Sequence, residues 1–189
     1  MTIKVVNTGS PLSGFLSGVR VLDLSQYIPG PMATLFLADM GADVLKIEPP
    51  QGDEMRNLGP KDAKGRPTFY RALNAGKSVR RMNLKDPGDR AAFLELVAGA
   101  DIVVEGFRPG VMQRLGIDYP VLSQVNPGVI LCSISGYGID VPYATRAGHD
   151  ANYLALMGVA HRNGGQMPAF FDPPMADGAG SLFAAMTIL

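Results

Sequence analysis

Short apolar runs alternate with segments of helical spacing through most of this chain, and this alternation constrains the fold more than any other feature. Residues 19–24 form an apolar run suited to a buried strand, and residues 32–40 carry apolar side chains at helical intervals. A second apolar run, residues 44–48, ends at two prolines. A strand, a helix and a strand of these lengths predict a βαβ unit with a right-handed crossover.

The same alternation resumes after a long polar segment. Residues 51–76 are rich in Gly, Pro, Lys and Asp, and they are predicted to be a loop or lid because packed connections are shorter. Asp86 is expected to cap a helix that begins at Pro87 and stops at Gly99. The remaining expected elements are a strand at 101–105, short helices at 111–115 and 121–125, a strand at 129–135, a helix at 147–157 and a loop at 161–175. A final helix is expected over 181–189, and residues 175–180 are expected to open it.

Four strands separated by helices predict an α/β fold with an open, mostly parallel, Rossmann-like sheet and helices on both faces. The apolar helical pattern at the C-terminus has no capping glycine, proline or basic last turn. The sequence is therefore expected to be the N-terminal part of a longer protein or a truncated homologue. Within it, residues 1–15 are predicted to be a lead and residues 16–189 to form one domain.

Composition excludes several classes of protein. The chain has 17 basic and 17 acidic side chains, whereas a general nucleic-acid or anionic-membrane binder normally has a basic excess. It has no apolar stretch of membrane-spanning length and no signal-peptide core, so a cytoplasmic protein without nucleic-acid or membrane partners is expected. Cys132 is the single cysteine and is expected to be a buried thiol; with no Cys/His ligand set, neither a metal nor a redox cofactor is predicted.

A ligand site is expected at the carboxyl ends of the strands, where open α/β sheets bind their ligands. Four segments should meet there, namely residues 25–31, 48–53, 105–110 and 135–150. The first of them has neither a GxGxxG motif nor a Walker lysine, which argues against classical dinucleotide and nucleoside-triphosphate sites. The helix that follows it still offers an N-terminus to an anion or a developing oxyanion.

Three side chains are candidates for chemistry at that edge. His149 and Asp150 follow the fourth predicted strand, and Asp177 stands among small residues that let a ligand approach the backbone. Each also has a structural interpretation, since an isolated histidine is more often a hydrogen-bonded structural group, and either aspartate could be a helix N-cap. His161 lies in the predicted polar loop and is expected to be solvated.

Several motifs resemble the family that contains the class III CoA-transferases and the 2-methylacyl-CoA racemases. Each motif alone is weak, but their order and spacing along the chain are specific. The motifs are residues 22–25 with 29–31, 37–48, 74–78, 105–112, 135–138 and 148–156, the last of which contains Gly-His-Asp. The resemblance implies a Rossmann-like CoA-binding domain, an acyl-CoA substrate, and a second, smaller domain that is absent or truncated here. It also implies interlocked homodimers.

Two reactions share this site in the family, according to the resemblance. In the racemases, the residues that match His149 and Asp177 remove and return the α-proton of a thioester from opposite faces. In the transferases, the match to Asp177 is a nucleophile that forms an acyl anhydride and then carries CoA. Because His149 is present, racemase is the preferred interpretation, with CoA-transferase and a truncated non-catalytic homologue as alternatives. Asp150 is expected to cap a helix or orient His149.

The resemblance also suggests which residues bind CoA. Phe107 and Arg114 match positions that line the CoA site. The residues predicted to contact phosphate or adenine are Lys46, Asn74, Lys77 and Arg108. The chain departs from the family at Pro49, where many relatives have arginine, and at residues 139–142, where Gln-x-Gly-Pro is usual.

Overall fold

The computed structural model describes residues 12–164, 167, 169 and 172–189. Among these residues, five strands form one sheet in the order β3-β2-β1-β4-β5, and every neighbouring pair is parallel. The strands are β1 (Arg20–Asp23), β2 (Asp43–Glu48), β3 (Ser78–Arg81), β4 (Ile102–Glu105) and β5 (Ile130–Ser133). The predicted parallel α/β sheet is therefore confirmed. The strand order changes direction between β1 and β4, which opens a crevice at their carboxyl ends.

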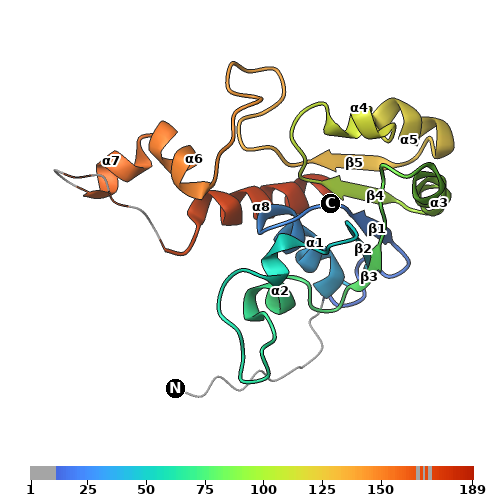
Figure 1. The fold of residues 1–189 in the computed structure, drawn as a ribbon, viewed down its shortest axis with the longest axis horizontal. Helices are drawn as coiled ribbons and strands as arrows, with labels where there is room; N and C mark the ends of the chain where they lie inside the picture. Colours follow the sequence, from blue (N-terminus) through green and yellow to red (C-terminus); the bar gives the residue numbers. More distant parts are fainter. Residues whose placement is uncertain (1–11, 165–166, 168, 170–171) are drawn as a thin grey trace.

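Helices cover both faces of the sheet, as predicted (Figure 1). One face carries α1 (Pro29–Asp39) and α8 (Met175–Ile188), which pack along each other. The other face carries α3 (Pro87–Val97), α4 (Val111–Leu115) and α5 (Tyr119–Val125). Successive residues of one strand face the two layers, because Val21 packs with Leu37 of α1 while Leu22 packs in the cluster of Phe93 from α3.

Strand β3 was missed by the sequence analysis. All four of its side chains are exposed at the edge of the sheet, so its sequence Ser-Val-Arg-Arg lacks the apolar run that marks a buried strand. The segment 51–76 also contains more structure than a loop: a 3₁₀ helix η1 (Glu54–Arg56) and the helix α2 (Thr68–Leu73). Buried Met55 and Tyr70 fix these two short helices to the body of the domain.

The remaining differences concern helix ends. The expected helix at 147–157 is α6 (Asp150–Leu156), and α8 begins at Met175, the first residue of the segment 175–180 that was expected to open the last helix. The predicted loop at 161–175 lies partly outside the described residues, and its first part is wrong because α7 (Val159–Gly164) places His161 on a helix. Figure 1 shows α6 and α7 extending away from the sheet.

Two local predictions concern single side chains. Asp86 caps α3 as predicted, because its carboxylate accepts hydrogen bonds from the N–H groups of Gly88 and Asp89 at 2.9 and 3.1 Å. Cys132 is only partly buried, although burial still raises the pKa of its thiol.

Of the helices that the structure describes, none is both long and apolar enough to cross a membrane.

Candidate active site

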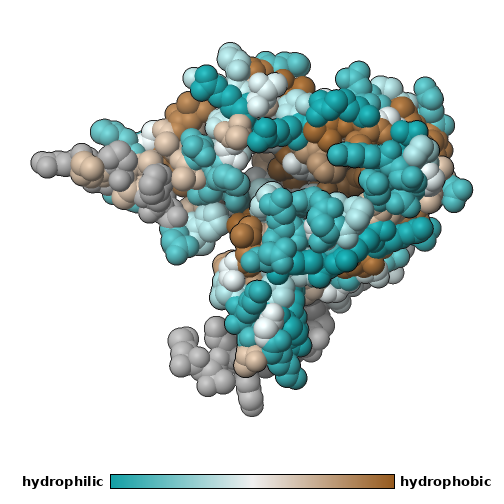
Figure 2. Space-filling model, viewed as in Figure 1, coloured by the Kyte–Doolittle hydropathy of each residue, from teal (hydrophilic) through white to brown (hydrophobic). Residues whose placement is uncertain are grey.

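A cavity of about 690 Å³ lies at the carboxyl ends of the central strands, where the strand order changes direction. The surface is hollowed there, between the ends of β4 and β5 and helix α6 (Figure 2). Its lining includes Tyr27 and Gly30 after β1, Phe107 and Arg108 after β4, and His149 and Asp177. The cavity therefore brings together four of the predicted site residues from three separate parts of the chain.

The turn after β1 is held in place by a buried network of charges. The carboxylate of Asp23 accepts hydrogen bonds from the side chains of Ser25, of Thr34 at 2.6 Å and of Lys77 at 3.1 Å. Burial alone would raise the pKa of Asp23, but Lys46 and Lys77 hold it below the usual range. The network thus fixes an ionised aspartate beneath the turn that lines the cavity.

Three predicted phosphate or adenine contacts belong to this network and do not line the cavity. The Lys46 ammonium lies 3.0 Å from Asp53 Oδ2 and donates to the Ser25 carbonyl at 2.8 Å, with both charged side chains fully buried. The Lys77 ammonium donates to Asn74 Oδ1 at 2.9 Å and to the Pro31 carbonyl at 2.7 Å. Burial lowers the pKa of Lys77 to about 8, although Asp23 acts in the opposite direction. The structure therefore places Lys46 and Lys77 against the backbone of the turn after β1, with Asn74 bound to Lys77.

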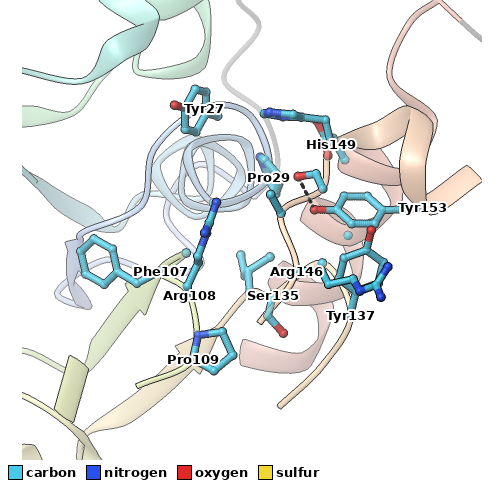
Figure 3. A pocket seen from close by; sticks show the side chains of 18 of the residues that line it. Tyr27, Pro29, Phe107, Arg108, Pro109, Ser135, Tyr137, Arg146, His149 and Tyr153 are labelled. Atoms are coloured by element: carbon cyan, nitrogen blue, oxygen red, sulfur yellow. Dashed lines mark hydrogen bonds between the residues drawn. The ribbon is translucent and has the colours of Figure 1, made fainter. Parts of the chain in front are cut away.

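Two tyrosines fix the loop that carries His149. The Tyr153 hydroxyl donates a hydrogen bond to the Gly148 carbonyl at 2.7 Å (Figure 3). The Tyr153 ring stands edge-on to the Tyr137 ring, with the two ring centroids 5.1 Å apart. A Cβ on Gly148 would lie 2.7 Å from the Tyr137 hydroxyl, so only glycine allows this packing. The backbone N–H of His149 donates to Asn152 Oδ1 at 2.9 Å, which starts α6 directly after the histidine.

Asp150 contacts the neighbouring helix rather than its own. Its Oδ1 accepts hydrogen bonds from the backbone N–H groups of Ala176 at 2.6 Å and Asp177 at 3.0 Å, and so caps the first turn of α8. One of its two expected roles, helix capping, is therefore observed, although on a different helix. Asp177 is half-buried in that first turn and lines the cavity. Burial and the nearby Asp150 raise the pKa of Asp177, while His149 acts in the opposite direction.

The cationic groups of the site are Arg108 and Arg146, which lie on two walls of the cavity (Figure 3). Both are exposed, and neither forms an ion pair with any residue that the structure describes. The sequence analysis missed Arg146, although a cation two residues before the Gly148-His149 motif was a usable signal. Arg114 is exposed on α4 outside this cavity, with its guanidinium near Gly110.

A second cavity of about 340 Å³ shares the wall formed by Phe107, Arg108 and Pro109 with the first. Three tyrosines also line the main cavity, although none was singled out from sequence: Tyr27 and Tyr137, in segments expected at this edge, and Tyr153 on α6. In the described part of the chain, no group of three or more His, Cys, Asp or Glu side chains is arranged to hold a metal ion. The main cavity thus offers a carboxylate, an imidazole and two guanidinium groups, of which Arg146 also stacks on the Tyr143 ring at 4.8 Å. This set of groups suits acyl or proton transfer on an anionic substrate.

Comparison with known proteins identifies the relatives of this chain. Residues 16–189 match the family described as CoA-transferase family III. The chain is 42% identical to acetyl-CoA:oxalate CoA-transferase from Acetobacter aceti over 80% of its length, and 37% identical to succinyl-CoA:glutarate CoA-transferase from Homo sapiens over 96%. It is 41% identical to the alpha subunit of succinyl-CoA–L-malate CoA-transferase from Chloroflexus aurantiacus over 92%. The chain spans 39%, 43% and 42% of these three relatives, respectively.

Solved structures show the same fold. A CAIB/BAIF family protein from Brucella suis matches 92% of this chain with a TM-score of 0.87 and 35% identity, and the match covers 47% of that protein. A hypothetical protein from Mycobacterium tuberculosis matches 92% of the chain with a TM-score of 0.84 and 31% identity, over 49% of its own length.

Proposed function

Because this chain belongs to CoA-transferase family III, we propose that it carries the nucleophile of a CoA-transferase and that this nucleophile is Asp177. The observation that supports this role most directly is that Asp177 faces the main cavity from the first turn of α8. The relatives are named as transferases of CoA between carboxylic acids, which favours this reaction over racemisation.

The proposed reaction is a balanced double exchange. The Asp177 carboxylate attacks the carbonyl carbon of the donor thioester, forms a mixed anhydride and releases the CoA thiolate. The thiolate attacks the Asp177 carbonyl, which releases the donor acid and leaves CoA as a thioester of Asp177. The acceptor carboxylate then attacks this thioester, and the thiolate released in that step takes the acceptor acyl group from the second anhydride. Asp177 returns as a carboxylate, and no proton or electron is gained or lost.

The surroundings of Asp177 suit this chemistry. Burial and Asp150 raise its pKa, and a more basic carboxylate is a stronger nucleophile once it is ionised. Arg108 and Arg146 offer cations to the phosphates of CoA or to a carboxylate substrate. Because the relatives are named for oxalate, succinate, glutarate and malate, we further propose that the acceptor is a dicarboxylic acid.

The second candidate is α-proton transfer, and one observation favours it: His149 lines the same cavity as Asp177. Two groups on opposite sides of an α-carbon would be sufficient for removal and return of its proton. The two reactions differ in what they require, since the transferase needs only Asp177 to be covalently modified, whereas the racemase needs both residues and forms no adduct.

The test is to trap the enzyme during turnover. The protein is incubated with succinyl-CoA and then with hydroxylamine, and the peptide that contains Asp177 is analysed by mass spectrometry. We expect a hydroxamate on Asp177 that persists in His149→Ala and disappears in Asp177→Asn. Asp39→Asn, an exposed position on α1, is the matched control.

A second measurement separates the remaining interpretations. Deuterium incorporation at the α-carbon of a 2-methylacyl-CoA, lost in both His149→Ala and Asp177→Asn and without any adduct, would replace the transferase proposal with the racemase. A folded chain with CoA bound but with neither adduct nor exchange would support the non-catalytic homologue instead.

A further inference from the structure

We infer that Tyr27 and Glu54 are positioning residues that fix the imidazole of His149 at the rim of the cavity. His149 has backbone contacts to α6, but its side chain meets only one other ring among the described residues. That ring is Tyr27, which stands edge-on to it with centroids 6.2 Å apart and planes at 80° (Figure 3). The position of the Tyr27 ring therefore bears directly on the position of the imidazole.

The hydroxyl of Tyr27 is held by Glu54, to whose carboxylate it donates a hydrogen bond. This hydrogen bond to Glu54 raises the pKa of the Tyr27 phenol, so the phenol remains a donor at neutral pH. Both side chains are at the surface, where isolated side chains usually choose their rotamers freely. A pair of surface side chains can position a third group only if the backbone that carries the pair is rigid.

The backbone that carries Glu54 is rigid because residues on either side of it, the η1 N-cap Asp53 and the last η1 residue Arg56, are anchored to β2. On one side, the Asp53 carboxylate is paired with Lys46 of β2 at 3.0 Å, with both side chains fully buried. On the other side, the Arg56 guanidinium binds Glu48 of β2 through three contacts of 2.9–3.2 Å. The polar segment after β2 thus places Glu54 at a fixed point relative to the sheet.

The backbone of Tyr27 indicates that its position is imposed by the surrounding structure. Its φ of 64° lies in the left-handed region, and no other non-glycine residue in the described part of the chain has a positive φ. A bulky residue rarely adopts this conformation unless its surroundings hold it there, and such residues concentrate at functional sites. The sheet, η1, Glu54, Tyr27 and His149 therefore form one continuous chain of contacts, which operates in either of the two candidate reactions.

The experiment is NMR of the protein labelled with ¹³C in its histidine rings. The chain has only two histidines, so His161→Gln assigns both signals, and His161 on α7 then serves as an internal reference. Tyr27→Leu removes the neighbouring ring and should abolish the ring-current shift of the His149 signals. Tyr27→Phe keeps the ring but removes the donor, and Glu54→Ala removes the acceptor, so each should move the His149 signals in the same way.

Two comparisons distinguish positioning from a general structural effect. Glu54→Gln retains an oxygen acceptor and should preserve the wild-type signals, and the double variant Tyr27→Phe/Glu54→Ala should shift them no further than either single change. Glu95→Ala, at an exposed position on α3, is the matched control and should change nothing. Unaltered His149 signals in Tyr27→Leu, or equal shifts in Glu54→Gln and Glu54→Ala, would overturn the inference. If Tyr27→Leu does not fold, the Tyr27→Phe and Glu54 variants decide the question.

Discussion

Oδ1 of Asp150 accepts a hydrogen bond from the backbone N–H of Asp177 at 3.0 Å, which joins the first residue of α6 to the first turn of α8. One carboxylate therefore orients the backbone of the proposed nucleophile and adds to burial, which raises the pKa of the Asp177 side chain. The two effects can be separated by substitution, because asparagine retains the acceptor oxygen and loses the charge.

Asp150→Ala should destabilise the protein by about 1 kcal/mol, the usual cost of losing a helix cap, whereas Asp150→Asn should cost less. Urea unfolding measures this difference. Asp150→Asn should also lower the pKa of Asp177, because a like charge beside it is removed. In the pH dependence of adduct formation, the acidic limb of Asp150→Asn should lie at lower pH than that of the wild type. An unchanged limb would show that Asp150 acts on Asp177 through geometry alone.

Asp177→Asn should stabilise the folded chain at neutral pH while it abolishes the adduct. The folded state raises the pKa of Asp177 above its unfolded value, so the folded state favours the protonated carboxyl. The stability that this carboxyl contributes is fully present below the pKa of Asp177 in the unfolded chain. It is lost as the pH rises through the higher pKa of Asp177 in the folded chain. Thermal unfolding at several pH values should therefore show equal stability for wild type and variant in acid, and a more stable variant at neutral pH. A less stable variant at pH 7 would contradict the proposed desolvation of Asp177.

Lys77 should make stability increase with pH in the alkaline range. Its pKa is lowered from 10.5 to about 8 by burial, so between these values the unfolded chain retains a proton that the folded chain has lost. The stability that Lys77 contributes is therefore fully present above its pKa in the unfolded chain. It is lost as the pH falls through its lower pKa in the folded chain. Lys77→Met should remove this slope from urea titrations between about pH 8 and 10.

Lys77→Met should in addition destabilise the protein at pH 7 by roughly 3–5 kcal/mol, because it removes one partner from the fully buried Asp23 carboxylate. Lys85→Met is the control, since Lys85 is exposed and forms no ion pair among the described residues. A loss of stability as small as that of the control would mean that Lys46 alone is sufficient to hold Asp23 ionised.

Gly148→Ala should lower stability by about 1–3 kcal/mol, since overpacking a filled site costs energy of that order. The new methyl group would lie 2.7 Å from the Tyr137 hydroxyl and 2.8 Å from the Tyr153 ring. Gly178→Ala, in α8, is the matched control: nothing lies within 4 Å of its Cβ position, and alanine favours a helix by up to about 1 kcal/mol over glycine. Melting temperatures should therefore move in opposite directions for the two variants.

The sequence predicted the core of the fold because burial leaves a pattern. Strands β1, β2 and β4 are buried between helix layers, and each appears as an apolar run in the expected place. Strand β3 has four exposed side chains and left no such pattern, so the sheet was predicted with one strand too few. The cap of α3 at Asp86 was predictable because capping depends on residues that are neighbours in the chain.

Most of the site depended on contacts between distant residues. The motifs identified His149 and Asp177 as candidates, but the structure brings them to one cavity. Lys46 and Lys77 were predicted to contact phosphate or adenine from the resemblance, because fixed cations suit phosphates. The fold instead supplies Asp53 and Asp23 as counter-charges and buries all four side chains. The sequence alone therefore determined the class of fold, which follows from local spacing, and it indicated the family and the candidate groups through motifs that resemble that family. Only the tertiary structure decided which charged groups face the cavity and which support it, because burial and pairing of charges depend on residues that meet only after folding.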